Sequence, residues 1–599
     1  MKELSALLDQ WLTLILLPIA VWVLLSGLDD LFINFVWLLS FYSRKRDDPS
    51  LEQLREEPQK RIAVYVPLWH EADVISDMVA HNVSAIQYRD YTIFIGVYPN
   101  DFDTVNAVRK LETRFKNVQM SMCPHDGPTS KADCLNWIYQ RMLLHEEAEG
   151  VRFDIILPHD AEDIIHPLSF LWINHYSEKY DMVQIPVLPL PTPFSEFTHG
   201  LYCDEFAENQ TKDLAVREIL GGFMPSCGVG TGFSRWALEQ LADREMNRIF
   251  DPSCLTEDYE NGFRLHAMKC RQMFAPLRMV DGEPVATREY FPRDFRSAVK
   301  QRTRWITGIS LQGWQKHGWK GGIGQIYWHW RDRKGLIGNF VSGLANVLFI
   351  YGLFTAATSV MTGLPWGLMR AALRLPLQFL LPATLFCQVI QLGSRMYCTS
   401  RFYGWWFAFG AIPRAIFGNS INILATSFAM LQFLRGYIKK ERISWLKTDH
   451  SYPTRAALTA HKTKLGEVLV MSNYCTREQM EQALSTKPKD MRLGEHMVKL
   501  GAITEDELYE ALSLQQNIPM AELDAKHLSP VISRALPAHV IRDYHVLPFK
   551  VAAGSLFVAG PDLPNDDLHK ALREFTRLEI RFELITQSNF DLLKAAISV

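Results

Sequence analysis

The chain has 599 residues, more than a single hydrophobic core usually serves, so we expect at least two domains. Its 63 lysines and arginines nearly balance its 66 aspartates and glutamates, which gives no argument for nucleic acid or any other polyanionic partner. Nine cysteines without any C-x-x-C pair argue against a disulfide framework or a structural zinc site and favour reduced thiols.

The first apolar segment, residues 11–28, carries no charge and is long enough to cross a bilayer, which takes about 20 residues. Two aspartates separate it from a second apolar piece at 32–42. Residues 1–43 therefore form one membrane crossing or two, and the sequence leaves this choice open. The basic cluster at 44–46 predicts that the following residues lie on the cytoplasmic side.

Residues 60–320 alternate apolar runs with helical patterns, which indicates a mostly parallel α/β sheet. The strand-like runs RIAVYVPLW, TIFIGVYPND and FDIILP are followed or ended by Glu71, Asp101 and Asp160. Ligands of open α/β sheets bind beyond the carboxyl ends of the strands. Each carboxylate alone is more often a turn or cap residue, but three of them at strand ends of one sheet indicate a binding site.

Three carboxylates, Asp160, Glu162 and Asp163, fall within four residues. Like charges this close repel each other unless something positive lies between them, so water, an arginine or a metal is expected there. His166 is nearby, but a lone histidine is more often a surface or capping residue.

Three later stretches are candidates for the same site. Residues 226–238 are glycine-rich before a helix, which lets the backbone approach a ligand closely. Glu257 and Asp258 stand at a predicted helix start, where negative charge also simply complements the helix dipole. QRTRW at 301–305 offers arginine forks suited to diphosphate oxygens and a tryptophan suited to a sugar face.

A second apolar block contains two spanning candidates, at 335–360 and 375–393. A third candidate, 404–434, has Pro413 and Arg414 near its middle. A charge at the bilayer centre costs about 3 kcal/mol. We therefore expect this segment to be two elements, or one broken helix that faces a cavity lined by protein.

After a linker at 438–454, residues 464–487 align without gaps to 492–515, a repeat of 28 residues. Each unit is predicted to form two short helices, the second capped by Thr476 or Thr504. Two units are too few for a solenoid, which favours a compact module. On periodicity alone, a small helical docking domain is the simpler interpretation.

In chain order, the strand-end Glu71 and Asp101, the D-x-D-like stretch at Asp160, the Thr-Glu-Asp at 256–258 and QRTRW resemble the processive membrane glycosyltransferases of family 2. Cellulose, chitin and hyaluronan synthases belong to that family. Each motif alone is weak, but five of them in order make the resemblance specific.

The resemblance implies an α/β catalytic domain of the glycosyltransferase A type, inserted between transmembrane helices and using Mg or Mn. The nucleotide sugar would contact Glu71, Asp101, Lys131, Asp160, Gln301, Arg302, Arg304 and Trp305. Asp160 and Glu162 would bind the metal, with Asp163 as the alternative to Glu162. Asp258, beside Glu257, would deprotonate the acceptor hydroxyl in a single inverting displacement.

The paired R/K-L-G pattern of the tail resembles the N-terminal domain of secretion and pilus ATPases of the MshE kind, in which two such motifs bind cyclic di-GMP. The resemblance implies a mainly helical α+β regulatory domain over residues 455–599. Its ligand contacts would be Lys464, Leu465, Gly466, Arg492, Leu493, Gly494, Gln515 and Asp562. No nucleotide-hydrolysing core follows, so the ATPase activity of that family is not expected.

The arrangement of an N-terminal transmembrane region (1–43), a catalytic domain (60–320), interfacial and transmembrane helices (321–437) and the regulatory tail resembles the bacteriophage adsorption protein B family of bacterial inner-membrane proteins. Because both soluble parts need cytoplasmic ligands, the chain between them must cross the membrane an even number of times.

We therefore expect a multi-pass inner-membrane enzyme that polymerises a UDP-sugar, an N-acetylhexosamine by family habit, onto a growing glycan and is activated by cyclic di-GMP. Membrane lipids and an outer-membrane export partner are expected, and nucleic acid is not. Two alternatives stay open: transfer of a single sugar to a lipid carrier, and a non-catalytic membrane receptor or scaffold.

Overall fold

The computed structural model describes residues 2–43, 49–244, 247–439 and most of 464–597; in the last range, residues 473, 489–490, 517, 522, 525–531, 533–535, 553–554 and 577 are excepted. Most of the linker predicted at 438–454 lies outside the described residues. The chain divides into two compact units, residues 1–76 with 90–452, and residues 77–89 with 453–599.

The first unit is built on a seven-stranded sheet in the order β3-β2-β1-β4-β7-β5-β8. Its strands are β1 (Ile62–Pro67), β2 (Tyr91–Val97), β3 (Val118–Met122), β4 (Ile155–Pro158), β5 (Met182–Gln184), β7 (Thr231–Ser234) and β8 (Gln272–Phe274). Only β7 runs antiparallel to its neighbours, which agrees with the mostly parallel sheet predicted from the sequence.

The apolar run at 181–190 forms two short strands rather than one. Pro186 has no N–H to donate to a ladder, so the run breaks between β5 and β6 (Val187–Pro189). β6 then pairs in parallel with β11 (Thr287–Glu289) in a separate sheet. A short antiparallel pair, β9 (Met279–Val280) and β10 (Glu283–Pro284), precedes β11.

Helices surround this sheet and complete its core. They are α2 (Leu51–Glu56), α3 (Ala72–Ala85), α4 (Phe102–Arg114), α5 (Lys131–Glu149), α6 (Ser169–Tyr176), α9 (Arg235–Arg244) and α10 (Glu257–Ala267). Tyr65 and Phe94 of the strands, Ile138 of α5 and Leu238 of α9 are fully buried together in the main apolar core. The core fixes the sheet, and the polar strand ends remain available to bind a ligand.

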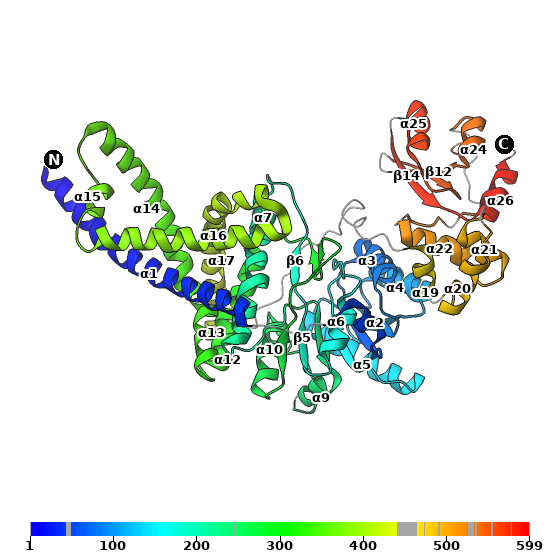
Figure 1. Cartoon of the computed structure of the whole chain (residues 1–599), viewed down its shortest axis with the longest axis horizontal. Coiled ribbons are helices and arrows are strands. Elements are labelled where there is room, and N and C mark those ends of the chain that lie inside the picture. Colours follow the sequence, from blue (N-terminus) through cyan, green and yellow to red (C-terminus); the bar gives the residue numbers. More distant parts are fainter. Residues whose placement is uncertain are drawn as a thin grey trace. The chain divides into compact units, whose positions relative to one another are not determined.

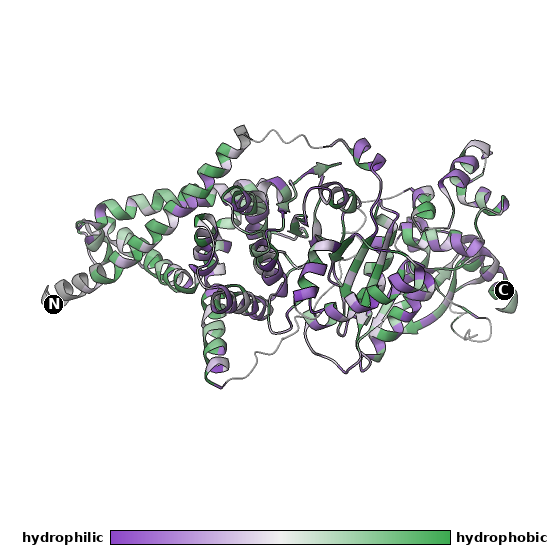
Figure 2. Cartoon of the chain, turned by 90° about the horizontal axis from the view of Figure 1, so that it is seen from below, coloured by the Kyte–Doolittle hydropathy of each residue, from purple (hydrophilic) through white to green (hydrophobic). Residues whose placement is uncertain are grey.

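Among the described residues, four helices are long and apolar enough to span a membrane: α1 (Lys2–Ser43), α14 (Gly335–Thr362), α16 (Leu377–Phe409) and α17 (Ala411–Lys439). Figure 2 shows that the long helices are mostly hydrophobic along their length. The two N-terminal apolar pieces form the single helix α1. Its Asp29 and Asp30 are neutralised by Arg331 and Lys334 at the end of α13 (Ile323–Arg333), so this acidic pair is compatible with a continuous helix.

Three of these helices, α1, α14 and α16, extend together away from the sheet (Figure 1). Gly27 of α1 lies against Cys387 of α16. Further along both helices, Asn34 of α1 donates a hydrogen bond to Gln391 of α16, so these two helices run side by side in the same direction. The short helix α15 (Leu368–Ala372) joins α14 to α16.

The segment with Pro413 and Arg414 forms two elements, as one of the two expectations had it. The backbone leaves helical geometry at Gly404, inside α16, and α17 begins at Ala411, which puts Pro413 in its first turn. Arg414 is fully buried and forms a bidentate ion pair with Asp204 of α7 (Phe197–Glu208). The charge is thus neutralised inside protein rather than exposed to lipid.

α17 lies along the catalytic part of the first unit. Beyond Arg414, its Asn422 accepts a hydrogen bond from Arg302 of α11 (Phe295–Trp305) at 2.7 Å. Ile421 and Ala425 are buried with Ala298 and Val299 of the same helix. Four shorter elements connect these regions: the π-helices η1 (Asn209–Asp213) and η2 (Ile306–Gln312), and the helices α8 (Leu214–Ile219) and α12 (Gly313–His317).

The tail repeat folds as predicted into two helix pairs, α19 (Leu465–Met471) with α20 (Arg477–Thr486), and α21 (Leu493–Lys499) with α22 (Glu505–Gln516). Thr476 and Thr504 accept N-terminal hydrogen bonds from Gln479 and Glu507, which confirms both predicted caps. A three-stranded sheet follows, made of β12 (Leu547–Ala552), β13 (Ser555–Gly560) and β14 (Glu579–Leu584), with helices α24 (Ala538–Tyr544), α25 (Asp566–Phe575) and α26 (Gln587–Ile597).

Candidate active site

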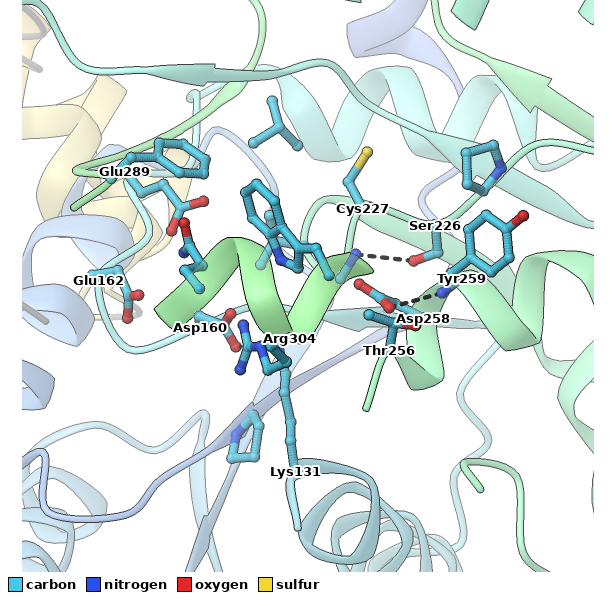
Figure 3. A pocket seen from close by; sticks show the side chains of 18 of the residues that line it. Lys131, Asp160, Glu162, Ser226, Cys227, Thr256, Asp258, Tyr259, Glu289 and Arg304 are labelled. Atoms are coloured by element: carbon cyan, nitrogen blue, oxygen red, sulfur yellow. Dashed lines mark hydrogen bonds and ion pairs between the residues drawn. The ribbon is translucent and has the colours of Figure 1, made fainter. Parts of the chain in front are cut away.

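A cavity of about 360 Å³ lies beyond the carboxyl ends of β1 and β4. The loop before β7, the start of α10, α11 and η1 complete its wall. Eight residues predicted from the sequence line it: Glu71, Lys131, Asp160, Glu162, Asp258, Gln301, Arg304 and Trp305. Figure 3 shows several of these side chains directed into the same space from different elements.

Lys131 and Asp160 form the polar centre of the cavity. Ser130 caps α5, so Lys131 is held in the first turn of that helix, and its Nζ lies 2.5 Å from Oδ1 of Asp160 at the end of β4. Burial by itself lowers the pKa of Lys131, but the Asp160 and Glu257 carboxylates outweigh this and hold the pKa well above its usual range. The cation beside the acidic cluster in this structure is therefore a lysine, which was not among the partners expected from the sequence.

Of the three clustered carboxylates, Glu162 faces the cavity and Asp163 does not. Asp163 is fully buried, lies 2.6 Å from Nδ1 of His159, and accepts a hydrogen bond from the backbone N–H of Asp160. Burial raises the pKa of Asp163 well above its usual range. Asp163 thus fixes the loop that presents Asp160, which leaves Glu162 as the second candidate metal ligand.

The carboxylates fit a hard divalent cation that is shared with a substrate. Asp160 and Glu162 supply oxygen donors to one cavity, but the described residues contain no group of three or more histidine, cysteine, aspartate or glutamate side chains placed to hold a metal. Mg and Mn commonly take one or two carboxylates and complete their shell with substrate phosphates and water. This donor set suits an ion that binds with a diphosphate.

Asp258 is the candidate base. It stands in the first turn of α10, and burial raises the pKa of its carboxyl group although the nearby Lys131 opposes the shift. Gly228 has a φ of +81°, and a Cβ on it would lie 2.8 Å from Oδ2 of Asp258. Glycine at this position therefore gives the carboxylate room at the cavity wall.

Glu257, predicted beside Asp258, does not line the cavity, and burial together with the Asp258 charge raises its pKa to about 7. Because this value exceeds the ordinary 4.5, the protonated carboxyl contributes stability that is complete below about pH 4.5 and lost as the pH rises through 7. Glu257→Gln should therefore leave the thermal midpoint unchanged near pH 4.5 and raise it at pH 8, where the free energy of unfolding increases by on the order of 3 kcal/mol at most. Thermal scans at both pH values measure this, and equal midpoints at pH 8 would contradict it.

The arginines of QRTRW have different environments. Arg304 and Trp305 line the cavity, and Nε of Arg304 is buried without a hydrogen bond to any described residue. Arg302 does not line the cavity, in contrast to the diphosphate contact expected from the sequence. Its guanidinium forms an ion pair with Glu205 at 2.6 Å and donates a hydrogen bond to Asn422. Arg302 and Arg304 are two positions apart on α11, so their side chains lie on different faces of the helix.

Glu71 and Asp101 follow adjacent strands as predicted, but only Glu71 reaches the cavity. Asp101 caps α4 and accepts a hydrogen bond of 2.6 Å from the backbone N–H of His70. Its carboxylate thus holds the turn that precedes Glu71. Asn136, in the same helix as Lys131, exchanges two hydrogen bonds with the backbone of Phe250.

Sequence reasoning missed a polar cluster at one side of the cavity. Asp332 of α13 forms a bidentate ion pair with Arg217 of α8 and accepts a hydrogen bond of 2.7 Å from the hydroxyl of Tyr259. All three line the cavity, and Tyr259 follows Asp258 directly. The cluster connects the helix of Asp258, the candidate base, to α13. Arg217 and Asp332 are more than 100 residues apart in the chain, so no local pattern identifies their pairing in the sequence.

In the tail, the paired motifs occupy equivalent positions. Lys464 and Arg492 are the exposed residues at the N-terminal caps of α19 and α21. Leu465 and Leu493 are half-buried after them, and Gln515 is half-buried near the end of α22. Asp562 is exposed and pairs with His545 at 2.8 Å.

The two motif glycines differ in their surroundings, and this gives a matched test. A Cβ on Gly494 would lie 2.3 Å from Leu508, whereas one on Gly466 would meet nothing closer than 3.4 Å. Gly494→Ala should destabilise the tail by about 1–3 kcal/mol through overpacking, and Gly466→Ala should be neutral or stabilising, since alanine favours a helix. Hydrogen exchange of the α22 amides in the full chain measures both; faster exchange in the Gly466 variant alone would contradict this.

The comparisons with known proteins agree with both parts. Residues 58–308 match the family model "Glycosyltransferase like family 2", and residues 516–594 match the "MshEN domain". The second match begins after the paired R/K-L-G motifs, so their assignment rests on the sequence pattern and the structure. Together these give a glycosyltransferase A-like α/β domain with a mixed sheet, flanking apolar helices and a C-terminal MshEN domain.

Relatives and solved structures cover different shares of the chain. The type IV pilus assembly ATPase PilB of Myxococcus xanthus is 36% identical over 110 residues, which is 18% of this chain and 19% of that protein. A mannosyltransferase from Pyrobaculum calidifontis, solved in complex with GDP-Man and Mn²⁺, is 16% identical and covers 67% of this chain and 99% of its own, with a TM-score of 0.40.

The match to bacteriophage adsorption protein B of Escherichia coli K12 extends over both units. The two chains are 34% identical over 584 residues, which is 92% of this chain and 77% of that protein. The chain therefore belongs to the bacteriophage adsorption protein B family, and it combines a family 2 glycosyltransferase domain with an MshEN domain.

Proposed function

We propose that the chain is an inner-membrane, inverting glycosyltransferase that polymerises a UDP-sugar into an exported polysaccharide and is activated by cyclic di-GMP. The observation that carries this proposal is the single cavity where Lys131, Asp160, Asp258 and Arg304 meet. It combines cationic groups suited to a diphosphate with a buried carboxylate suited to a base.

Different residues bind the donor, hold the metal and accept the proton during sugar transfer. Lys131 and Arg304 hold diphosphate oxygens and oppose the charge that develops there, while Trp305 offers an apolar face to the sugar. Asp160 and Glu162 would hold Mg or Mn, which when bound neutralises charge on the departing diphosphate. Asp258 accepts the proton of the acceptor hydroxyl as that oxygen attacks the anomeric carbon, and a one-step attack of this kind inverts the configuration.

The test is the release of UDP by the purified protein in detergent, with a panel of UDP-sugars and Mg or Mn. We expect release from one donor, with a product whose anomeric configuration is opposite to that of the donor. An absence of release from every nucleotide sugar, in a preparation whose tail binds cyclic di-GMP, would favour the scaffold alternative.

We further propose that α17 lies at the cytoplasmic membrane surface and that only α14 and α16 cross between the catalytic domain and the tail. The contacts of α17 with α7 and α11, from Arg414 to Ala425, support this. A helix that crosses the bilayer would extend away from α7 and α11 instead of packing along them. Two crossings put both soluble parts on the same side, which meets the even number expected from the sequence.

The topology is tested with reporter fusions. Green fluorescent protein fused after Val599 should fluoresce and alkaline phosphatase fused there should be inactive, because the tail lies in the cytoplasm. Alkaline phosphatase inserted at 363–367, between α14 and α15, should be active. An active phosphatase after Val599 would mean an odd number of crossings and would contradict the proposal.

A further inference from the structure

A second cavity, of about 510 Å³, lies between α11 and α17. One side of it is cationic: Arg296, Lys300 and Arg304 follow each other at intervals of four residues, which places them in a row on one face of α11. Among the described residues that line this cavity, none is acidic. The cavity therefore presents a row of positive charge that suits an anion with several oxygens.

The opposite side is apolar and open. Leu424 and Phe428 of α17 line the cavity and are 40% and 48% exposed. Phe295 and Val299 of α11 add apolar surface beside the cationic row. α17 is apolar enough to span a bilayer, so its exposed side chains suit lipid rather than water. A cationic wall facing an apolar wall fits a molecule with an anionic head and a hydrocarbon chain.

The second cavity adjoins the candidate active site. Arg304 lines both cavities, and Leu255, which lines the second, precedes Asp258 by three residues. Figure 3 shows Arg304 among the side chains that line the first cavity, together with Asp160 and Asp258. An anionic group bound along the α11 row would therefore lie at the edge of the space where Asp258 and the donor diphosphate are proposed to meet.

Resting on the proposed function, we propose that the cavity between α11 and α17 binds the acceptor as a lipid: a long-chain lipid phosphate that carries the growing glycan. Arg296 and Lys300 bind its phosphate oxygens, and its chain lies along Leu424 and Phe428. A free glycan has no hydrocarbon chain to pack against the apolar wall. The position of the cavity next to Asp258, the proposed base, favours an acceptor over a phospholipid that takes no part in the reaction.

The transfer step is balanced with this acceptor. The O–H bond of a sugar hydroxyl on the lipid breaks, and its proton passes to the carboxylate of Asp258. The oxygen forms a bond to the anomeric carbon of the donor sugar while the bond from that carbon to the diphosphate oxygen breaks. The electron pair leaves with the nucleoside diphosphate, and no oxidant or reductant is required.

The experiment uses the full-length protein in phosphatidylcholine nanodiscs with a photoreactive polyprenyl phosphate as the probe. We expect adducts on α11 or α17, and Arg296→Gln with Lys300→Gln should lower their yield about 30-fold below saturation, because each charge contributes about fivefold. Leu424→Trp, which fills the cavity without altering charge, should also lower the yield. The control Arg293→Gln with Arg435→Gln removes two exposed charges outside the cavity and should change the yield by no more than about twofold.

Competition and product analysis identify the occupant. Unlabelled polyprenyl phosphate should displace the probe, whereas phosphatidylglycerol and inorganic phosphate should not. With a radiolabelled nucleotide sugar, label should enter the lipid extract only when a polyprenyl phosphate glycolipid is present. Equal displacement by phosphatidylglycerol, adducts that survive both cavity variants, or label that never enters lipid would each overturn the proposal. UDP release that continues without any adduct would overturn it while leaving the glycosyltransferase function intact.

Discussion

Asp258→Asn should reduce sugar transfer by about 10²- to 10⁴-fold while leaving donor binding intact, because a positioned base contributes this much to a rate. Asparagine has nearly the same size, so Gly228 still accommodates it and the helix start at α10 is preserved. UDP release under single-turnover conditions measures the rate, and isothermal titration of UDP in the presence of Mn measures binding.

Glu257→Gln is the matched control, since it removes a carboxylate from the neighbouring position, which does not line the cavity. Glu257→Gln should lower the rate by no more than about tenfold, because Glu257 acts on the cavity only through its electrostatic field. Normal turnover by the Asp258 variant would contradict the assignment of the base. Loss of UDP binding in that variant would instead indicate that Asp258 holds the donor.

Arg414→Met should destabilise the first unit by about 3–5 kcal/mol, because it leaves Asp204 in a buried position without its partner. Burial already raises the pKa of Asp204, and the paired Arg414 opposes this shift. The thermal midpoint of the purified protein in detergent should fall by several degrees, and more at pH 8 than at pH 5, because the unpaired carboxyl is protonated more readily at low pH.

The double variant Asp204→Asn with Arg414→Met should recover most of the loss, because it removes both charges. A single variant that is as stable as the parent would show that the buried pair does not anchor α17 to α7. A double variant no more stable than the single one would show that Arg414 acts mainly through its packing against Phe407.

The features that could be predicted from the sequence share one property: residues nearby in the chain determine their positions. Asp160 and Glu71 follow apolar runs that form neighbouring parallel strands, so their meeting at one edge of the sheet follows from the fold. The helix caps Thr476 and Thr504 depend only on residues three positions further along. Such features need no knowledge of distant contacts.

The parts that were missed depend on long-range packing. Nothing in the neighbouring sequence distinguishes Arg302 from Arg304. Arg302 nevertheless pairs with Glu205 and Asn422 outside the cavity, whereas Arg304 lines it. The ion pair of Asp332 with Arg217 joins helices more than 100 residues apart. Length and composition place α17 among the helices that could span a membrane, and they likewise do not predict that it packs against α11.

We propose that cyclic di-GMP bound by the tail governs sugar transfer in the first unit, and UDP release with and without this dinucleotide measures that control. Complete switching from 1:99 to 99:1 in favour of the active state requires about 5.5 kcal/mol of differential binding. With the preferred UDP-sugar, cyclic di-GMP should raise UDP release by about tenfold or more, and Arg492→Ala should abolish the increase while the basal rate remains. Equal release with and without cyclic di-GMP, by protein that binds it, would contradict the account.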